Sequence, residues 1–240
     1  MSNREVMDPA TGSAAGHPTV VYYHHVHPSL RHYTSLTPGD FARSLDVLQQ
    51  ALAPCDPRAL WNGGAPALPE APSFLLTFDD GYLDTWEHAL PEMEARGLRA
   101  MFFVTTELVG VRDADGGPTA NFLDWEQCRE LQARGHLVGS HSVLHRPLTD
   151  LPPAQAAEDV RASLDDVSAR LGAPCPFYSY PFGFVPESPV CPPGVWGFGT
   201  VKAAARPWSA QPHNIRRTYL PTGQVDDWPA LAAGWRGQWG

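Results

Sequence analysis

Short hydrophobic runs alternate along the chain with segments in which apolar residues recur every three or four positions. The runs predict buried strands over residues 19–23, 74–78, 100–105, 136–139, 177–180, 195–201 and 215–220. The spaced pattern predicts helices after a Thr37 cap, from Leu83 to Met93, over 124–134 and over 153–171. This alternation favours an α/β fold with a parallel sheet. Polar residues gather where the strands end, so we expect the functional site at the C-terminal mouth of the sheet or barrel.

The length of 240 residues fits one principal domain. We expect a flexible tail over residues 1–18, a catalytic domain over 19–225 and a C-terminal tail over 226–240. Apolar residues make up 43% of the chain, which is enough for a core and excludes the disordered class.

The charge balance narrows the range of partners. Lys and Arg number 17 against 26 Asp and Glu, and a net charge of −9 argues against nucleic acid as a partner. No stretch is long and apolar enough to span a membrane, and no secretory signal is visible. The chain as written therefore predicts a cytoplasmic protein, or an extracellular or cell-envelope one if a leader was removed.

Cys175 and Cys191 flank one loop. They are either unpaired thiols or, in an oxidising compartment, a disulfide, and the sequence leaves both readings open.

Candidate chemistry lies at two of these strand ends. Asp79 and Asp80 follow one strand directly before Gly81; such a pair suits one metal ligand and one general base, or caps a following helix. His141 and His145 follow another strand, at the i and i+4 spacing that lets two imidazoles hold one cation. Because strand ends gather at one mouth, Asp80, His141 and His145 predict a three-ligand metal site with an open position.

Further polar and aromatic residues follow other strands. His24 or His25, directly after the first strand, suits a general acid, although a polar loop is the alternative. The segment from Ser179 to Gly183 ends another strand. Five of the eight tryptophans, Trp196 among them, lie in the last 45 residues, where they either stack on sugar rings or pack a loop-rich segment.

These segments, in this order, resemble the polysaccharide deacetylases of carbohydrate esterase family 4. Thr77–Gly81 (TFDDG) is similar to the first motif of that family, His141–His145 (HSVLH) to the second and Ser179–Gly183 (SYPFG) to the third. The opening YHHV and the later TPGDF helix start resemble the branch that deacetylates poly-β-1,6-N-acetylglucosamine, in which an N-terminal histidine replaces a C-terminal one. The resemblance runs from about Thr19 to Leu220.

The resemblance implies a distorted (β/α) barrel of about seven strands. It implies a metal-dependent hydrolase that removes N-acetyl groups from an amino-sugar polymer or oligomer and releases acetate. Asp79 would be the general base and His24 the general acid. Asp80, His141 and His145 would hold one divalent ion: zinc, or else cobalt, nickel or manganese. The substrate contacts would be Phe182, Tyr180, His25 and Trp196, and a backbone N–H near Phe182 would stabilise the oxyanion.

The chain departs from the family pattern at two places. Ser179 stands where the third motif has an arginine, and the C-terminal LxH motif is missing, which fits the branch that uses an N-terminal histidine. On an alternating strand Ile215, Arg217 and Tyr219 share a face, so Arg217 is the expected replacement for the missing arginine and Arg216 the alternative. Two other functions stay open: a deacylase or deformylase of a small nucleotide- or lipid-linked sugar, and a catalytically weak carbohydrate-binding pseudoenzyme.

Overall fold

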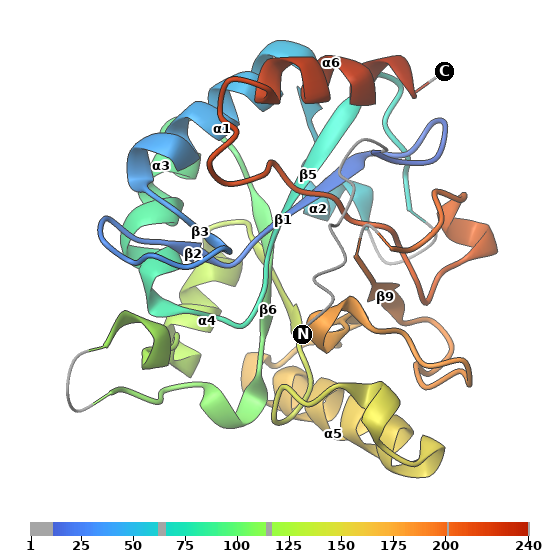
Figure 1. Cartoon of the computed structure of the whole chain (residues 1–240). Helices are drawn as coiled ribbons and strands as arrows, with labels where there is room; N and C mark the ends of the chain where they lie inside the picture. The colour runs from blue at the N-terminus through green and yellow to red at the C-terminus, as the bar shows by residue number, and fades with distance from the viewer. Residues whose placement is uncertain (1–11, 62–65, 114–116, 201, 240) are drawn as a thin grey trace, which may run out of the picture.

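The computed structural model describes residues 12–61, 66–113, 117–200 and 202–239, and a curved parallel sheet forms its centre (Figure 1). Its strands lie side by side in the order β1 (Thr19–Tyr23), β5 (Ser73–Phe78), β6 (Ala100–Val104), β7 (Leu137–Ser140), β8 (Phe177–Ser179) and β9 (Trp196–Phe198). Strand β4 (Ala53–Pro54) pairs with the start of β5, and β2 (His25–Val26) pairs with β3 (Ser35–Leu36) in a separate ribbon.

A segment near the C-terminus closes this sheet into a distorted barrel. Ile215 pairs with Phe198 of β9, and Thr218 pairs with Val21 of β1. The N–H of Thr218 donates to the Val20 carbonyl and the N–H of Gly199 to the Ile215 carbonyl, each at 2.8 Å. The predicted α/β barrel is thus confirmed. Its closing segment is a pair of isolated bridges, where the sequence pattern predicted a continuous strand over 215–220.

Helices cover the outside of the sheet. They are α1 (Pro38–Ala51), α2 (Pro57–Leu60), α3 (Leu90–Ala95), α4 (Trp125–Ala133), α5 (Pro153–Leu171) and α6 (Trp228–Gly237). A π-helical turn, Thr85–Ala89, precedes α3, and short 3-10 turns span Thr106–Leu108, Pro118–Ala120, Leu148–Asp150, Pro181–Gly183 and Trp208–Ala210. The predicted cap is present, because Thr37 Oγ1 accepts the Asp40 N–H at 3.0 Å.

The segment over 226–240 that the sequence suggested as a tail contains helix α6. This helix packs beside α1 (Figure 1), and the indoles of Trp228 and Trp235 are almost fully buried. The described part of the expected N-terminal tail lies against the same end of the chain, since the Gly16 N–H donates to the Trp239 carbonyl at 2.9 Å. Both segments therefore belong to the packed body, and residues 1–11 lie outside the described part of the chain.

The two faces of the strands bury two separate clusters. Val20, Leu75, Phe103, Phe198 and Ile215 belong to a cluster that includes residues from strands around the sheet, which places it inside the barrel. Their sequence neighbours on the strands, such as Val21 and Phe102, pack with the helices outside. The period of two along each strand therefore decides which side chains reach the barrel interior and its mouth.

Candidate active site

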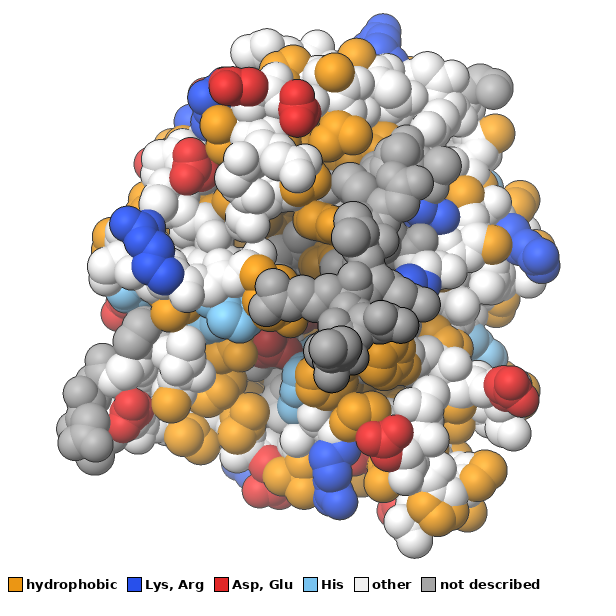
Figure 2. Space-filling model, in the orientation of Figure 1, with side chains coloured by type: hydrophobic (Ala, Val, Ile, Leu, Met, Phe, Trp, Pro, Cys, Tyr) orange, Lys and Arg blue, Asp and Glu red, His pale blue; other side chains and the backbone are white. Residues whose placement is uncertain are grey.

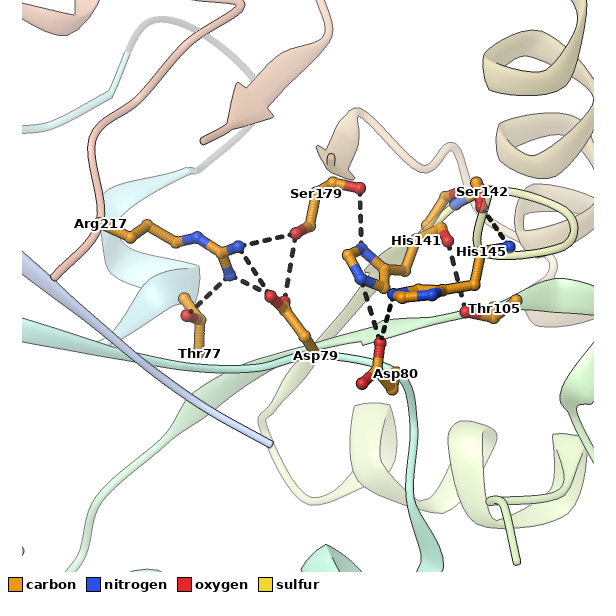
Figure 3. Close-up of polar contacts among 10 residues, drawn as sticks. Thr77, Asp79, Asp80, Thr105, His141, Ser142, His145, Ser179 and Arg217 are labelled. Atoms are coloured by element: carbon orange, nitrogen blue, oxygen red, sulfur yellow. Dashed lines mark hydrogen bonds and ion pairs between the residues drawn. The ribbon is translucent and has the colours of Figure 1, made fainter. Parts of the chain in front are cut away.

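Alternation along the strands brings Asp79 and Arg217 to the mouth of the barrel. Asp79 continues the inward face of Leu75 and Thr77 just beyond β5, and Arg217 continues the inward face of Ile215. Figure 3 shows these two side chains meeting beside Ser179, at the end of β8. Acidic and histidine side chains are visible in a recess near the middle of the face in Figure 2, with hydrophobic side chains around it.

Arg217 grips both oxygens of the Asp79 carboxylate. Its two terminal nitrogens donate to Oδ1 and Oδ2 at 2.7 Å each, and Ser179 Oγ donates to Oδ1 at 3.2 Å. Burial raises the pKa of Asp79, but the charge and hydrogen bonds of Arg217 more than offset this, so the pKa lies below its ordinary value. The result is a buried, ionised carboxylate held in one orientation.

The structure places Arg217, and not Arg216, at this carboxylate. The guanidinium of Arg217 lies between the rings of Tyr22 and Phe103, with centroids 5.1 and 5.7 Å away. A terminal nitrogen of Arg216 instead donates to the Ala203 carbonyl at 2.7 Å. Ser179 stands beside Arg217 and accepts one of its N–H groups at 2.9 Å, so the serine leaves room for an arginine from the segment that closes the barrel.

Asp80 faces the two histidines on the other side of the mouth (Figure 3). His141 Nε2 lies 3.1 Å and His145 Nε2 3.0 Å from Asp80 Oδ1. Three non-glycine residues here adopt positive φ values: Asp80 at 69°, Ser142 at 70° and His145 at 54°. Such backbone is strained, and it turns adjacent side chains in different directions, so that Asp79 and Asp80 serve different partners.

The donor atoms of Asp80, His141 and His145 fit a divalent cation. Their ligand atoms lie within 4.8 Å of one another. The Nδ1–H of His141 donates to the Ser179 carbonyl at 2.8 Å, which leaves the lone pair of a neutral ring on Nε2, facing a carboxylate oxygen. That oxygen, Asp80 Oδ1, is buried and makes no hydrogen bond of acceptable geometry within the described structure. Two imidazole lone pairs and an anionic oxygen that converge in this way suit zinc and similar ions.

We expect His141→Ala and His145→Ala to weaken binding of Zn²⁺ by more than about 100-fold, because loss of an outer-shell partner alone costs roughly 10–100-fold. Metal affinity measured by competition with a chelator checks this. His213→Ala, a histidine in Pro-His-Asn remote from the triad in sequence, is the matched control and should bind Zn²⁺ like the parent. Equal affinity of all three variants and the parent would rule out this metal site.

We expect Arg217→Ala to lower turnover by about 10- to 100-fold, because the Asp79 carboxylate loses the bidentate hydrogen bonds that orient it. Breaking a buried ion pair also costs about 3–5 kcal/mol of stability, so folding must be followed by denaturation in parallel. Arg217→Lys keeps the positive charge but not the bidentate contact, and it should give an intermediate rate. Arg216→Ala is the control; an equal, small effect of both alanine variants would mean that Arg217 does not position Asp79.

His24 lies beside this site, whereas His25 is enclosed. His24 is half-buried, and its ring packs edge-on against Tyr22, with centroids 5.7 Å apart. Burial lowers the pKa of His24, partly offset by the nearby carboxylates of Asp80 and Asp79. His25 Nδ1 bonds Asp84 Oδ2 at 2.7 Å while its ring stacks on Tyr82 at 3.6 Å, and only 3% of it is exposed. The placement of the buried His25 ring therefore does not favour the predicted contact with the substrate.

The other predicted substrate contacts fall in three different places. Phe182 is 54% exposed and lies next to His145, with ring centroids 4.7 Å apart. Tyr180 is buried, and its hydroxyl pairs with Cys191 Sγ at 3.0 Å. Trp196 begins β9 and packs near Trp61, at the edge of the sheet opposite the mouth. The structure therefore brings only Phe182 of these three to the site. Cys175 and Cys191 are both free thiols.

Sequence reasoning did not foresee the full part that Ser179 plays. Its hydroxyl bridges Arg217 and Asp79, while its carbonyl accepts the His141 ring proton. The only sequence signal was its place in SYPFG, at the position of the missing arginine.

Comparison with known proteins identifies the family. The family model described as polysaccharide deacetylase matches residues 68–190, which is just over half of the chain. This chain belongs to the polysaccharide deacetylase family. The matched region of this deacetylase-family chain contains Asp79, Asp80, His141 and His145, whereas His24 and Arg217 lie outside it.

Several known proteins resemble this member of the polysaccharide deacetylase family. The structure of IcaB from Ammonifex degensii is 27% identical, with a TM-score of 0.72 over 95% of this chain and 100% of that one. The Streptococcus pyogenes deacetylase PplD, solved in complex with acetate, has the same fold, at 19% identity and a TM-score of 0.71 over 90% and 97% of the two chains. YxkH of Bacillus subtilis (strain 168), also named as a polysaccharide deacetylase, is 28% identical over 115 residues, which make up 48% of this chain but only 38% of YxkH. No helix in the described structure is long and apolar enough to cross a membrane.

Proposed function

We propose that this protein is a metal-dependent hydrolase that removes N-acetyl groups from an amino-sugar polymer or oligomer and releases acetate. The observation that carries the proposal is the pairing, at one barrel mouth, of an oriented carboxylate with a separate three-ligand cluster. Asp79 is held ionised by Arg217, and Asp80 meets His141 and His145. Membership of the polysaccharide deacetylase family supports the same reaction.

The residues at the mouth of the barrel have separate roles in the proposed amide hydrolysis. A divalent ion bound by Asp80, His141 and His145 would supply Lewis-acid polarisation at the reacting centre. Asp79 accepts the proton of the attacking water, and Arg217 keeps its carboxylate aimed and ionised. His24 donates a proton to the amine nitrogen as the C–N bond breaks, because an amide anion is too poor a leaving group. The backbone N–H of Phe182 is the proposed oxyanion donor.

His24, the proposed general acid, comes from the N-terminal part of the chain. This position supports poly-β-1,6-N-acetylglucosamine as the substrate class, because the branch of the family that acts on it uses an N-terminal histidine. The C-terminal LxH motif is absent, and His24 lies close enough to both aspartates for their charges to affect its pKa. The likeness to IcaB covers 95% of this chain and 100% of that one, which is well beyond the region that the family model matches. We therefore place β-1,6-linked N-acetylglucosamine oligomers first among the substrates and zinc first among the metals.

The experiment is a screen for acetate release by the zinc-loaded protein. The panel contains β-1,6- and β-1,4-linked N-acetylglucosamine oligomers and a nucleotide-linked N-acetyl sugar. We expect release from the oligomers, fastest with the β-1,6 linkage. Release from the nucleotide-linked sugar alone would support the small-sugar deacylase instead, and binding of oligomers without release would support a carbohydrate-binding pseudoenzyme.

A further inference from the structure

A strip of exposed side chains leads away from the proposed metal site. The centroid of the Phe182 ring lies 4.7 Å from that of the His145 ring and 6.2 Å from that of the Phe184 ring, and the two phenyl planes are only 24° apart. Lys202 Nζ lies 5.6 Å from the centre of the Phe184 ring. Phe182, Phe184 and Lys202, called the aromatic strip below, are thus linked by successive contacts to His145 of the site.

The backbone holds the inner end of this strip in a constrained turn. Phe182 has a φ of 58° and Gly183 a φ of 68°. A Cβ atom at Gly183 would lie 1.7 Å from Thr200 Cγ2, so the turn packs directly against Thr200. A phenyl group exposed from a left-handed backbone position is costly twice, in strain and in apolar surface left in water. The fold therefore holds the Phe182 ring exposed next to His145 at a cost in free energy.

The outer end of the strip borders a surface pocket. The pocket has a volume of about 420 Å³, and Thr149, Phe184, Lys202 and Asn214 are among the residues that line it. Phe184 is 41% exposed. An aromatic face with hydroxyl, amide and ammonium groups around it is the combination that binds a sugar ring, whose C–H face is apolar and whose rim is polar.

We propose that the aromatic strip is a distal subsite for the sugar units next to the one being deacetylated, and that Lys202 makes it selective for units that still carry their acetyl group. This inference rests on the proposed function, because the strip begins at His145. The two nearly parallel phenyl rings provide successive stacking faces for neighbouring rings of one saccharide chain.

The charge of Lys202 supplies the selectivity. An N-acetylated unit is neutral, whereas a unit that has lost its acetyl group carries an ammonium group at neutral pH. An ammonium group held near Phe184 meets the like charge of Lys202, and such repulsion discriminates against that unit. A free amine in the distal subsite should therefore slow reaction at the proximal sugar, which spaces free amines along the product chain.

The stacking part is tested with Phe184→Ala. We expect the KM for a fully acetylated oligomer to rise about 10-fold with kcat unchanged, since truncation of an aromatic contact at a binding surface commonly costs about that factor in affinity. The KM for a monomeric N-acetyl sugar should not change. Val111→Ala, which truncates a similarly exposed apolar residue elsewhere on the surface, is the control. An unchanged KM would overturn the subsite. So would a change in the oligomeric state of Phe184→Ala, measured by sedimentation, because the exposed ring would then serve contacts between protein chains.

The selectivity part is tested with Lys202→Gln, with Lys202→Arg as the variant that keeps the charge. We compare kcat/KM for oligomers with one free amine beside the reacting unit with kcat/KM for fully acetylated oligomers. We expect Lys202→Gln to raise the ratio of the first to the second about 10-fold. Lys202→Arg should behave like the parent, and equal discrimination by all three proteins would refute the role of Lys202. The dissociation constants of both oligomers, measured by calorimetry in an Asp79→Asn background, follow the subsite without turnover. A failed subsite is thus distinguishable from a failed proposed function.

Discussion

Replacing Asp79 with asparagine should lower acetate release by about 10²–10⁴-fold, the usual range for loss of a general base. The amide has nearly the same shape as the carboxylate and still contacts Arg217 and Ser179, but it cannot accept the proton of the attacking water. Because Asp80, His141 and His145 remain in place, Zn²⁺ affinity should change little. Steady-state kinetics and metal content of the same preparations check both halves of this expectation.

Asp80→Asn is the matched variant, one residue along the chain and also buried. It should lose affinity for Zn²⁺, because Asp80 is the carboxylate that faces both histidines. If Asp79→Asn loses the metal and Asp80→Asn keeps it, the roles of the two aspartates are the reverse of those proposed here.

Replacing His24 with alanine should lower turnover by a similar factor of about 10²–10⁴ while leaving metal content unchanged. His24 is the histidine that borders the mouth, half-buried and near both aspartates. Without it, the amine would have to leave without a positioned proton donor. A more acidic leaving amine needs less help from a proton donor. The His24→Ala substitution should therefore slow hydrolysis of an activated N-acetyl arylamine far less than hydrolysis of a sugar substrate.

His25→Ala is the informative comparison because His25 is the next residue in the same segment. Its ring is buried against Tyr82 and Asp84, so we expect lower stability, with the rate per folded molecule little changed. A dead His25→Ala protein that folds normally, together with a nearly normal His24→Ala protein, would contradict the assignment of the acid.

The elements and the strand faces could be predicted well from local patterns. Strand β1 and helix α5 have the predicted bounds, since an uninterrupted buried run and an apolar stripe ending at Gly172 depend only on nearby residues. Alternation along one strand also predicted that Arg217, and not Arg216, faces inward. Helix α6 was missed although Trp228, Ala232 and Trp235 have helical spacing, because Pro229 and the glycines of this segment favour loops.

Contacts between distant segments were out of reach of the same reasoning. The burial of His25 depends on Asp84, 59 residues away, and the use of Tyr180 in packing depends on a thiol in another loop. The surroundings of Trp196 depend on how Trp61 packs. A motif places a residue type near a strand end, but only the packing of other segments decides whether its side chain reaches the mouth or the core.

The most direct test of the account is a zinc titration of the chelator-stripped protein, followed by acetate release from a β-1,6-linked N-acetylglucosamine oligomer. We expect almost no release without metal, a linear rise with added Zn²⁺, and a break at one ion per chain. The double variant His141→Ala, His145→Ala should stay inactive throughout the titration. Full activity of the stripped parent protein, or zinc-dependent activity in the double variant, would contradict the claim that Asp80, His141 and His145 hold the ion that deacetylation requires.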